Sequence, residues 1–178
     1  MGRAREIADL IGGTTPDIIL KTSDGAILNL QTSDTTVTAD SVLGAINFQA
    51  PDEASGTDAI LIGSKIEAIA EGTFSASSNA TSLVFSTASS AAAGTVSGKM
   101  TFTSGGNLII KDTDTADGSS PTITLQSGDT DIAANDVLGT INFQAPDEGT
   151  GTDAILVAAG IEAVSEGDFS SSSNATKL

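Results

Sequence analysis

One stretch of this chain occurs twice. VLGAINFQAPDE at residues 42–53 returns as VLGTINFQAPDE at residues 137–148. Residues 30–83 (copy 1) align with residues 125–178 (copy 2) without a gap, at a constant offset of 95 positions (125 − 30). About 35 of about 54 aligned positions are identical, which indicates internal duplication. A feature that is used twice along one chain is more often architecture than an active site, so the duplication favours a structural role.

The composition limits the core that one chain can enclose. The 178 residues include six Phe and no Trp or Tyr, and aromatic side chains bury the largest areas in most cores. The apolar residues, 39% of the chain, fall in short segments that alternate with polar residues. We therefore expect an elongated oligomer in which several chains contribute inward-facing residues to one narrow core.

Charge and missing residue types exclude several classes of function. The formal net charge is −16 and only seven residues are Lys or Arg, so nucleic acid is not an expected ligand. The chain has neither Cys nor His, which removes thiolate nucleophiles, imidazole bases, disulfides and ordinary zinc sites. No apolar run approaches the length of a signal peptide core or a membrane span. We expect no catalytic, cofactor or metal site.

The N-terminal segment, residues 1–13, predicts a short helix. Ile7, Leu10 and Ile11 follow helical spacing, and Gly12-Gly13 ends the pattern. Such a helix is too short to be stable alone in water. It either docks on a neighbouring chain or another protein, or frays as a terminus.

Strands are predicted before and inside copy 1. Asp24-Gly25 lies between two apolar runs and indicates a β-hairpin in the region 14–29, with strands at about 18–22 and 26–31, the second of which runs into the start of copy 1. Ile46 and Phe48 alternate with polar neighbours over residues 42–49, the pattern of a half-buried strand. Pro51 ends it.

The rest of the duplication predicts further strands. Residues 59–71 alternate as a strand does, although their Ala and Glu content suits a helix, and we favour the strand. Phe74 precedes a Ser-rich turn at 75–78, and residues 83–87 predict a strand. The connector between the copies, residues 84–124, contains a loop at 88–98 and strands at 99–103 and 108–111, joined by a turn at 104–107. Copy 2 stops where copy 1 enters a strand, so we expect the native polypeptide to continue past Leu178.

Two acidic motifs are candidates for chemistry. The pairs Asp52-Glu53 and Asp147-Glu148 have the residue types of a glycosidase, but adjacent strand residues point to opposite faces, which favours turn capping or solvation. Residues 112–118, DTDTADG, resemble the start of a calcium loop. The third acid is misplaced for an EF-hand and the later Glu is missing, so a surface turn is the simpler interpretation.

The segments LQTSDTTV, VLGAINFQAPDEASGTDAILIGSKIEAIAEGTFSASSNATSLVF and KMTFTSGGNLII closely resemble shaft repeats of tail-fibre-like structural proteins of tailed bacteriophages, notably marine ones. The resemblance covers about residues 28–178. It implies a homotrimeric, β-rich fibre on the virion that serves host attachment. It also implies that the N-terminal helix is a virion attachment segment that contacts other virion proteins.

These observations predict an all-β, elongated, fibrous trimer and a non-enzymatic structural subunit of a virion fibre or appendage. The alternatives are a capsid decoration or an adhesin module that binds a host surface glycan, and a tailspike depolymerase that would use the paired acids. The residues expected in the shared core are Ile46, Phe48, Phe74, Phe85, Ile141, Phe143 and Phe169.

Overall fold

The computed structural model describes residues 23–49, 61–88, 96–145 and 156–178. Within these residues the chain forms strands, turns and irregular segments, and no helix. The strands fall into two antiparallel sheets, one in each of two compact units, Met1–Pro121 and Thr122–Leu178. The all-β class predicted from the sequence is confirmed.

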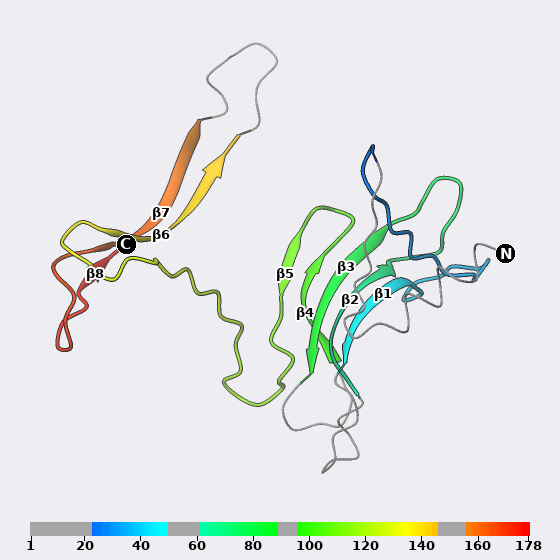
Figure 1. Ribbon diagram of the computed structural model, residues 1–178, viewed down its shortest axis with the longest axis horizontal. Helices are drawn as coiled ribbons and strands as arrows, with labels where there is room; N and C mark the ends of the chain where they lie inside the picture. The colour runs from blue at the N-terminus through cyan, green and yellow to red at the C-terminus, as the bar shows by residue number, and fades with distance from the viewer. Residues whose placement is uncertain (1–22, 50–60, 89–95, 146–155) are drawn as a thin grey trace. The chain divides into compact units, whose positions relative to one another are not determined.

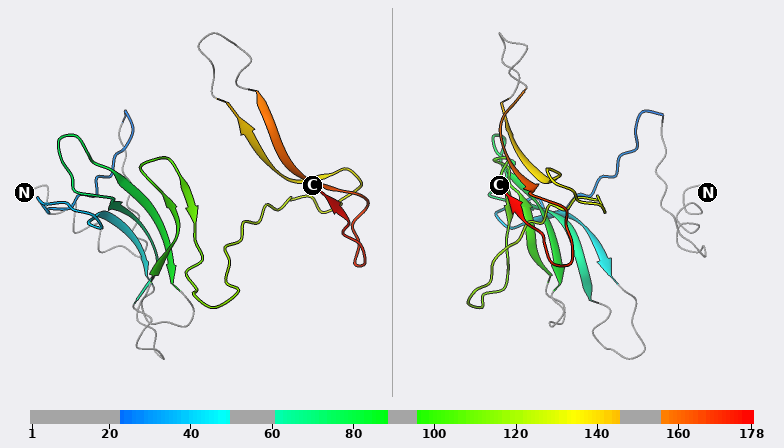
Figure 2. Two further views of the ribbon diagram at one scale, coloured as in Figure 1. Left: turned by 180° about the vertical axis from the view of Figure 1, so that it is seen from behind. Right: turned by 90° about the vertical axis from the view of Figure 1, so that its left-hand side faces the viewer.

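The first unit contains one five-stranded sheet in which each strand pairs with the next strand along the chain (Figures 1 and 2). The strands are β1 (Val42–Gln49), β2 (Ile62–Ala70), β3 (Thr81–Ala88), β4 (Val96–Phe102) and β5 (Leu108–Ile110), and all neighbouring pairs are antiparallel. This meander needs only local connections, which fits the short strands and frequent turns of the sequence.

The second unit contains a three-stranded sheet. Its strands are β6 (Val137–Gln144), β7 (Val157–Ser165) and β8 (Thr176–Lys177), in the order β6-β7-β8 (Figure 1). β6 pairs with β7 from Val137 to Gln144, whereas β8 pairs only with Val164 and Ser165. Copy 2 therefore repeats the first two strands of copy 1 and the beginning of the third.

The two copies also share details of their backbone conformation. The β1–β2 ladder has register shifts at Val42/Gly44 and Phe48/Gln49, and the β6–β7 ladder has them at the equivalent positions. Asp40 and Asn135 precede these ladders with positive φ angles of 68° and 73°. Asp and Asn tolerate the left-handed region better than most residues. Each residue donates its N–H across the sheet at 2.9 Å, Asp40 to the Ala70 carbonyl and Asn135 to the Ser165 carbonyl.

The Ser-rich turns are held in the same way in both copies. The Phe74 N–H donates to the Val37 carbonyl at 3.0 Å, and the equivalent Phe169 N–H donates to the Ile132 carbonyl at 2.9 Å. A bridge between Ser75 and Ser78 closes the first turn, as predicted, and its counterpart closes the second. These bonds tie the turn after each long strand to the segment before the repeat's first strand.

Most strand predictions are confirmed. β1 covers the predicted residues 42–49, and the ambiguous segment 59–71 contains β2. Tertiary pairing decides that ambiguity, because β2 forms ladders with both β1 and β3. The two connector strands appear as β4 and β5, and Gly106 has a φ of 78° in the predicted turn between them.

The second arm of the predicted N-terminal hairpin is wrong. Gly25 has a φ of 99° as a turn residue would, but residues 26–31 form no strand. Instead of pairing in a hairpin ladder, this segment places Leu30 against Gly44 of β1. The first arm and the predicted helix at residues 2–11 lie outside the described residues.

The described residues of one chain enclose almost no apolar core. Among the described residues, the buried apolar side chains are Ala70 (1% exposed) and Val84 (9%). Ile46 and Phe48 are 45% and 53% exposed in one chain, and their burial in a core shared between chains stays a prediction. Ile141 and Phe143 are similarly exposed, whereas Phe74, Phe85 and Phe169 are half-buried.

Candidate assembly surface

The registers of the four ladders place apolar side chains in rows across one face of the five-stranded sheet. Directly paired residues of antiparallel strands share a face, so the rows follow from the pairing. One row is Ile46, Ile66, Phe85, Met100 and Ile110. The next row is Gly44, Ala68, Leu83, Phe102 and Leu108. We call this side of the sheet the apolar face.

The apolar face is internally packed but largely open. The rings of Phe85 and Phe102 meet edge to face, with centroids 6.3 Å apart and planes at 73°. This is a favoured aromatic geometry between diagonal neighbours on adjacent strands. The side chains of Leu83, Phe102 and Leu108 are nevertheless exposed. An apolar face of this extent, left open by the described residues, is typical of an interaction surface.

Near β1 the apolar face is partly covered from within the chain. A Cβ added to Gly44 would lie 2.7 Å from the Leu30 Cβ, so only glycine allows this close crossing. The crossing leaves a shallow groove of about 260 Å³, whose lining includes Leu28, Leu30, Ile46, Ile66 and Leu83. The groove is an apolar depression in the same surface.

The opposite face is mixed in character, and it contains the buried residues Glu67, Val84 and Ser86. Lys65 and Glu67 lie two positions apart on β2 and form an ion pair at 2.6 Å. Glu67 is 6% exposed and pairs in register with Ala45 and Val84 on the neighbouring strands. The charge of this carboxylate is met by a cation on its own strand, as a buried charge requires.

The sheet of the second unit has the corresponding apolar face. Ile141 pairs with Ile161, and Phe143 pairs with Ala159. Ile141, Phe143 and Ile161 are all about half exposed. Both copies therefore present an equivalent apolar surface that the described part of the chain leaves open.

Glu71, just after β2, binds two other parts of the first unit. Its carboxylate accepts hydrogen bonds from the Ser104 hydroxyl, from the Ser82 hydroxyl at 2.5 Å and from the Ser104 N–H at 2.9 Å. The Ser104 hydroxyl bond, followed by the other two, lowers the pKa of Glu71 below its ordinary value. Glu71 thereby attaches the β4–β5 turn to the end of β2.

Of the acidic motifs singled out in the sequence, only residues 112–118 lie in the part of the chain that the structure describes. Asp52-Glu53 and Asp147-Glu148 lie outside the described residues. In the calcium-like segment, Asp112 and Asp114 accept backbone N–H bonds at 2.9 and 3.0 Å, from Asp114 and Ala116. The segment is therefore a run of side-chain-capped turns. The described part of the chain contains no cluster of acidic residues suited to a metal ion.

Several members of the apolar face were not predicted. They are Ile66, Leu83, Met100, Phe102, Leu108 and Ile110, all on predicted strands. The alternation of Met100 and Phe102 with Thr101 was a visible signal of a shared face. The alignment of these strands into rows was not visible, because it depends on the register between segments far apart in the chain.

No family model, curated protein or solved structure matches this chain. Among the residues that the structure describes, no helix has the length and hydropathy needed to cross a membrane.

Proposed function

We propose that this chain is a non-enzymatic structural subunit of a bacteriophage virion fibre or appendage, assembled as a homotrimer with a shared apolar core. One observation carries the proposal, the open apolar face of the five-stranded sheet, whose equivalent recurs in copy 2. Burying exposed apolar area stabilises an assembly by about 25 cal/mol per Å². Self-association is the simplest way to cover a face that every copy of the chain presents.

The resemblance of the repeats to phage shaft proteins supports the identity of the assembly. Duplication along the chain fits a shaft, because a fibre lengthens by adding similar units. In the same proposal the predicted N-terminal helix contacts other virion proteins.

The first experiment is the mass and shape of the purified chain in solution, by light scattering combined with small-angle X-ray scattering. The proposal expects about three chains per particle and a scattering profile of a rod. A compact monomer at micromolar concentration would contradict it.

A chain that remains monomeric would also turn attention to the binding-module hypothesis. Glycan-array binding by the intact chain, or its presence as a regular lattice on capsids, is what that hypothesis expects. Neither result is expected from a passive shaft subunit.

A further inference from the structure

An amine, a carboxamide and a carboxylate lie together on the face opposite the apolar face. Asn47 on β1 pairs directly with Lys65 on β2, and Glu67 follows Lys65 by two positions on the same side of its strand. Directly paired residues of antiparallel strands have Cβ atoms about 4.5–5.5 Å apart. The long, flexible Lys65 side chain can therefore reach both the carboxylate along its own strand and the Asn47 amide across the ladder. We call these three residues the reactive trio.

The Lys65–Glu67 half of the trio is already in contact. The Lys65 Nζ lies 2.6 Å from the Glu67 Oε1, within the range of about 2.6–3.2 Å over which a general base takes a proton. Glu67, Val84 and Ser86 are all buried, so water is largely kept from this part of the face. Polar interactions are stronger where water is excluded. Glu67 is thus positioned to remove the proton that Lys65 must lose before its nitrogen can attack.

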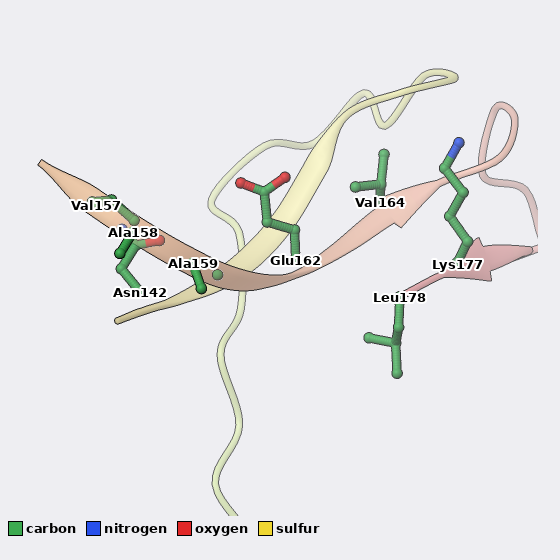
Figure 3. A pocket seen from close by; sticks show the side chains of 9 residues that line it. Asn142, Val157, Ala158, Ala159, Glu162, Val164, Lys177 and Leu178 are labelled. Atoms are coloured by element: carbon green, nitrogen blue, oxygen red, sulfur yellow. The ribbon is translucent and has the colours of Figure 1, made fainter. Parts of the chain in front are cut away.

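Copy 2 shows how the Asn side chain lies across the ladder. Asn142 is the counterpart of Asn47 and pairs with Gly160, the counterpart of Lys65. A Cβ built on Gly160 would lie 3.1 Å from the Asn142 Oδ1. Figure 3 shows the Asn142 side chain against β7, with Glu162 farther along that strand. The Asn amide therefore reaches the position from which the Lys65 side chain starts in copy 1.

We propose that Lys65 and Asn47 form an intramolecular isopeptide bond, with Glu67 as general base and general acid. The electron pair of the Lys65 Nζ attacks the Asn47 Cγ, and the bond from Cγ to Nδ2 breaks. The Nζ loses two protons in all, and Glu67 transfers them to Nδ2, which leaves as an ammonium ion. One amide replaces another, so the step needs no oxidant, reductant or co-reactant. Asn47 is exposed, which gives the ammonium ion a path to solvent.

The bond would join β1 to β2 covalently, within the first ladder of copy 1. A crosslink of this kind stabilises the folded state by restricting the unfolded chain. Copy 2 keeps the amide and the carboxylate but has Gly160 in place of the amine, so it cannot form the same bond. The bond lies within one chain and forms in a monomer or in an oligomer, so the proposal does not rest on the fibre function.

The test is the mass of the purified full chain. The intact mass, measured after denaturation, is expected to be lower than the sequence mass by one ammonia. Digestion after glutamate locates the loss, because Glu53 lies between Asn47 and Lys65 and separates them in a chain without the bond. The crosslinked chain is expected to give one branched fragment that carries both residues. Trypsin is expected not to cleave after Lys65.

Matched variants assign the roles within the trio. Lys65→Arg keeps the positive charge but removes the amine, and it is expected to have the full sequence mass. Asn47→Asp changes the leaving group, so it is expected to lose water instead of ammonia. Glu67→Gln is expected to slow formation of the bond strongly, because the general base is lost. Asn142→Ala, in copy 2, is the control and is expected to lose ammonia as the wild type does.

Three results would overturn the proposal. One is a folded wild-type chain that keeps its full sequence mass after prolonged incubation, which would show that the trio is an ion pair only. Another is loss of ammonia without a branched fragment, which would indicate cyclisation of an asparagine. The third is loss of ammonia that persists in Lys65→Arg. None of these results changes the number of chains per particle, so failure of the crosslink and failure of the fibre function are distinguishable.

Discussion

In copy 1 the long strand β2 has a ladder on each side, whereas the equivalent strand β7 in copy 2 has a full ladder only with β6. The two first ladders share their registers and bulges despite this difference. The same register in both copies follows from their shared sequence, because the alternation of apolar residues and the bulges recur at equivalent positions. The third strand changes what is buried, since Glu67 is buried in copy 1 and Glu162 is exposed in copy 2.

The largest expected effect tests whether the two open apolar faces are equivalent core surfaces. Phe48→Ala and Phe143→Ala are each expected to lose about 3–5 kcal/mol of assembly or folding stability, if assembly buries these rings. Their exposures in one chain, 53% and 54%, are nearly equal, so similar losses are expected. Thermal unfolding at several protein concentrations measures the effect. Asn142→Ala, on the opposite face, is the control, and an unchanged melting temperature in either Phe variant would contradict the core assignment.

A smaller effect tests the crossing segment. A Cβ on Gly44 would lie 2.7 Å from the Leu30 Cβ and 3.1 Å from its carbonyl oxygen, whereas a Cβ on Gly139 meets the Leu125 Cβ at 2.9 Å and its oxygen only at 3.7 Å. Gly44→Ala is expected to cost about 1–3 kcal/mol, with Gly139→Ala at the lower end. Denaturant unfolding measures both.

The control for this comparison is Gly63→Ala. Its added Cβ approaches nothing closer than 3.7 Å, so it is expected to be neutral or slightly stabilising. Equal losses at Gly44 and Gly63 would show that the crossing of Leu30 is not what requires glycine.

A third prediction concerns the position where Ala70 in copy 1 is replaced by Ser165. The Ser165 hydroxyl is 0% exposed, accepts the Asp136 N–H at 3.0 Å and donates to the Ala133 carbonyl. Ser165→Ala is expected to lower the free energy of unfolding by about 0.5–1.5 kcal/mol. The loss is limited because the Asp136 N–H also donates a hydrogen bond directly to the Ala133 carbonyl at 3.3 Å, which partly replaces the contacts of the hydroxyl. Ala70→Ser, the reciprocal change, is expected to be close to neutral. Chemical unfolding measures the stability of both variants. A larger loss of stability in Ala70→Ser than in Ser165→Ala would contradict the prediction.

The smallest expected effect is a dependence on pH that arises from Glu71, at the end of β2 in copy 1. Glu71 has a lowered pKa in the folded chain, chiefly because of the Ser104 hydroxyl. A lowered folded pKa contributes stability above the ordinary carboxyl pKa, and this stability is lost as the pH falls through the folded value. Amide hydrogen exchange in the β4–β5 turn, corrected for the intrinsic exchange rate at each pH, is expected to become faster as the pH falls below the ordinary carboxyl pKa.

Glu71→Gln is expected to remove this acid dependence, and Glu166→Gln in copy 2 serves as the matched control. In copy 2 the position of Ser82 is occupied by Lys177, so the hydroxyl contact cannot be formed there. If the hydrogen-exchange rates of the β4–β5 turn depend on pH in the same way in the wild type and in Glu71→Gln, the carboxylate does not anchor the turn.

Much of this architecture is predictable because it is local. Alternation at Ile46 and Phe48 gave the bounds of β1, and glycines at 105 and 106 gave the turn between β4 and β5. The strand predicted at residues 26–31 is wrong. Their apolar pattern fits a strand, but a tertiary contact places Leu30 over Gly44. The hydrogen bonds between Glu71 and Ser104 could not be predicted from the sequence, because only the folded sheet brings these two residues together.

The sequence by itself determined the duplication, the all-β class and most strand positions, since alternation and turn residues act over a few neighbouring positions. The tertiary structure decided which apolar residues share a row and which face of the described sheet stays open. Those features depend on the register between separate segments, and shifting a strand by one residue would move its apolar side chains to the other face.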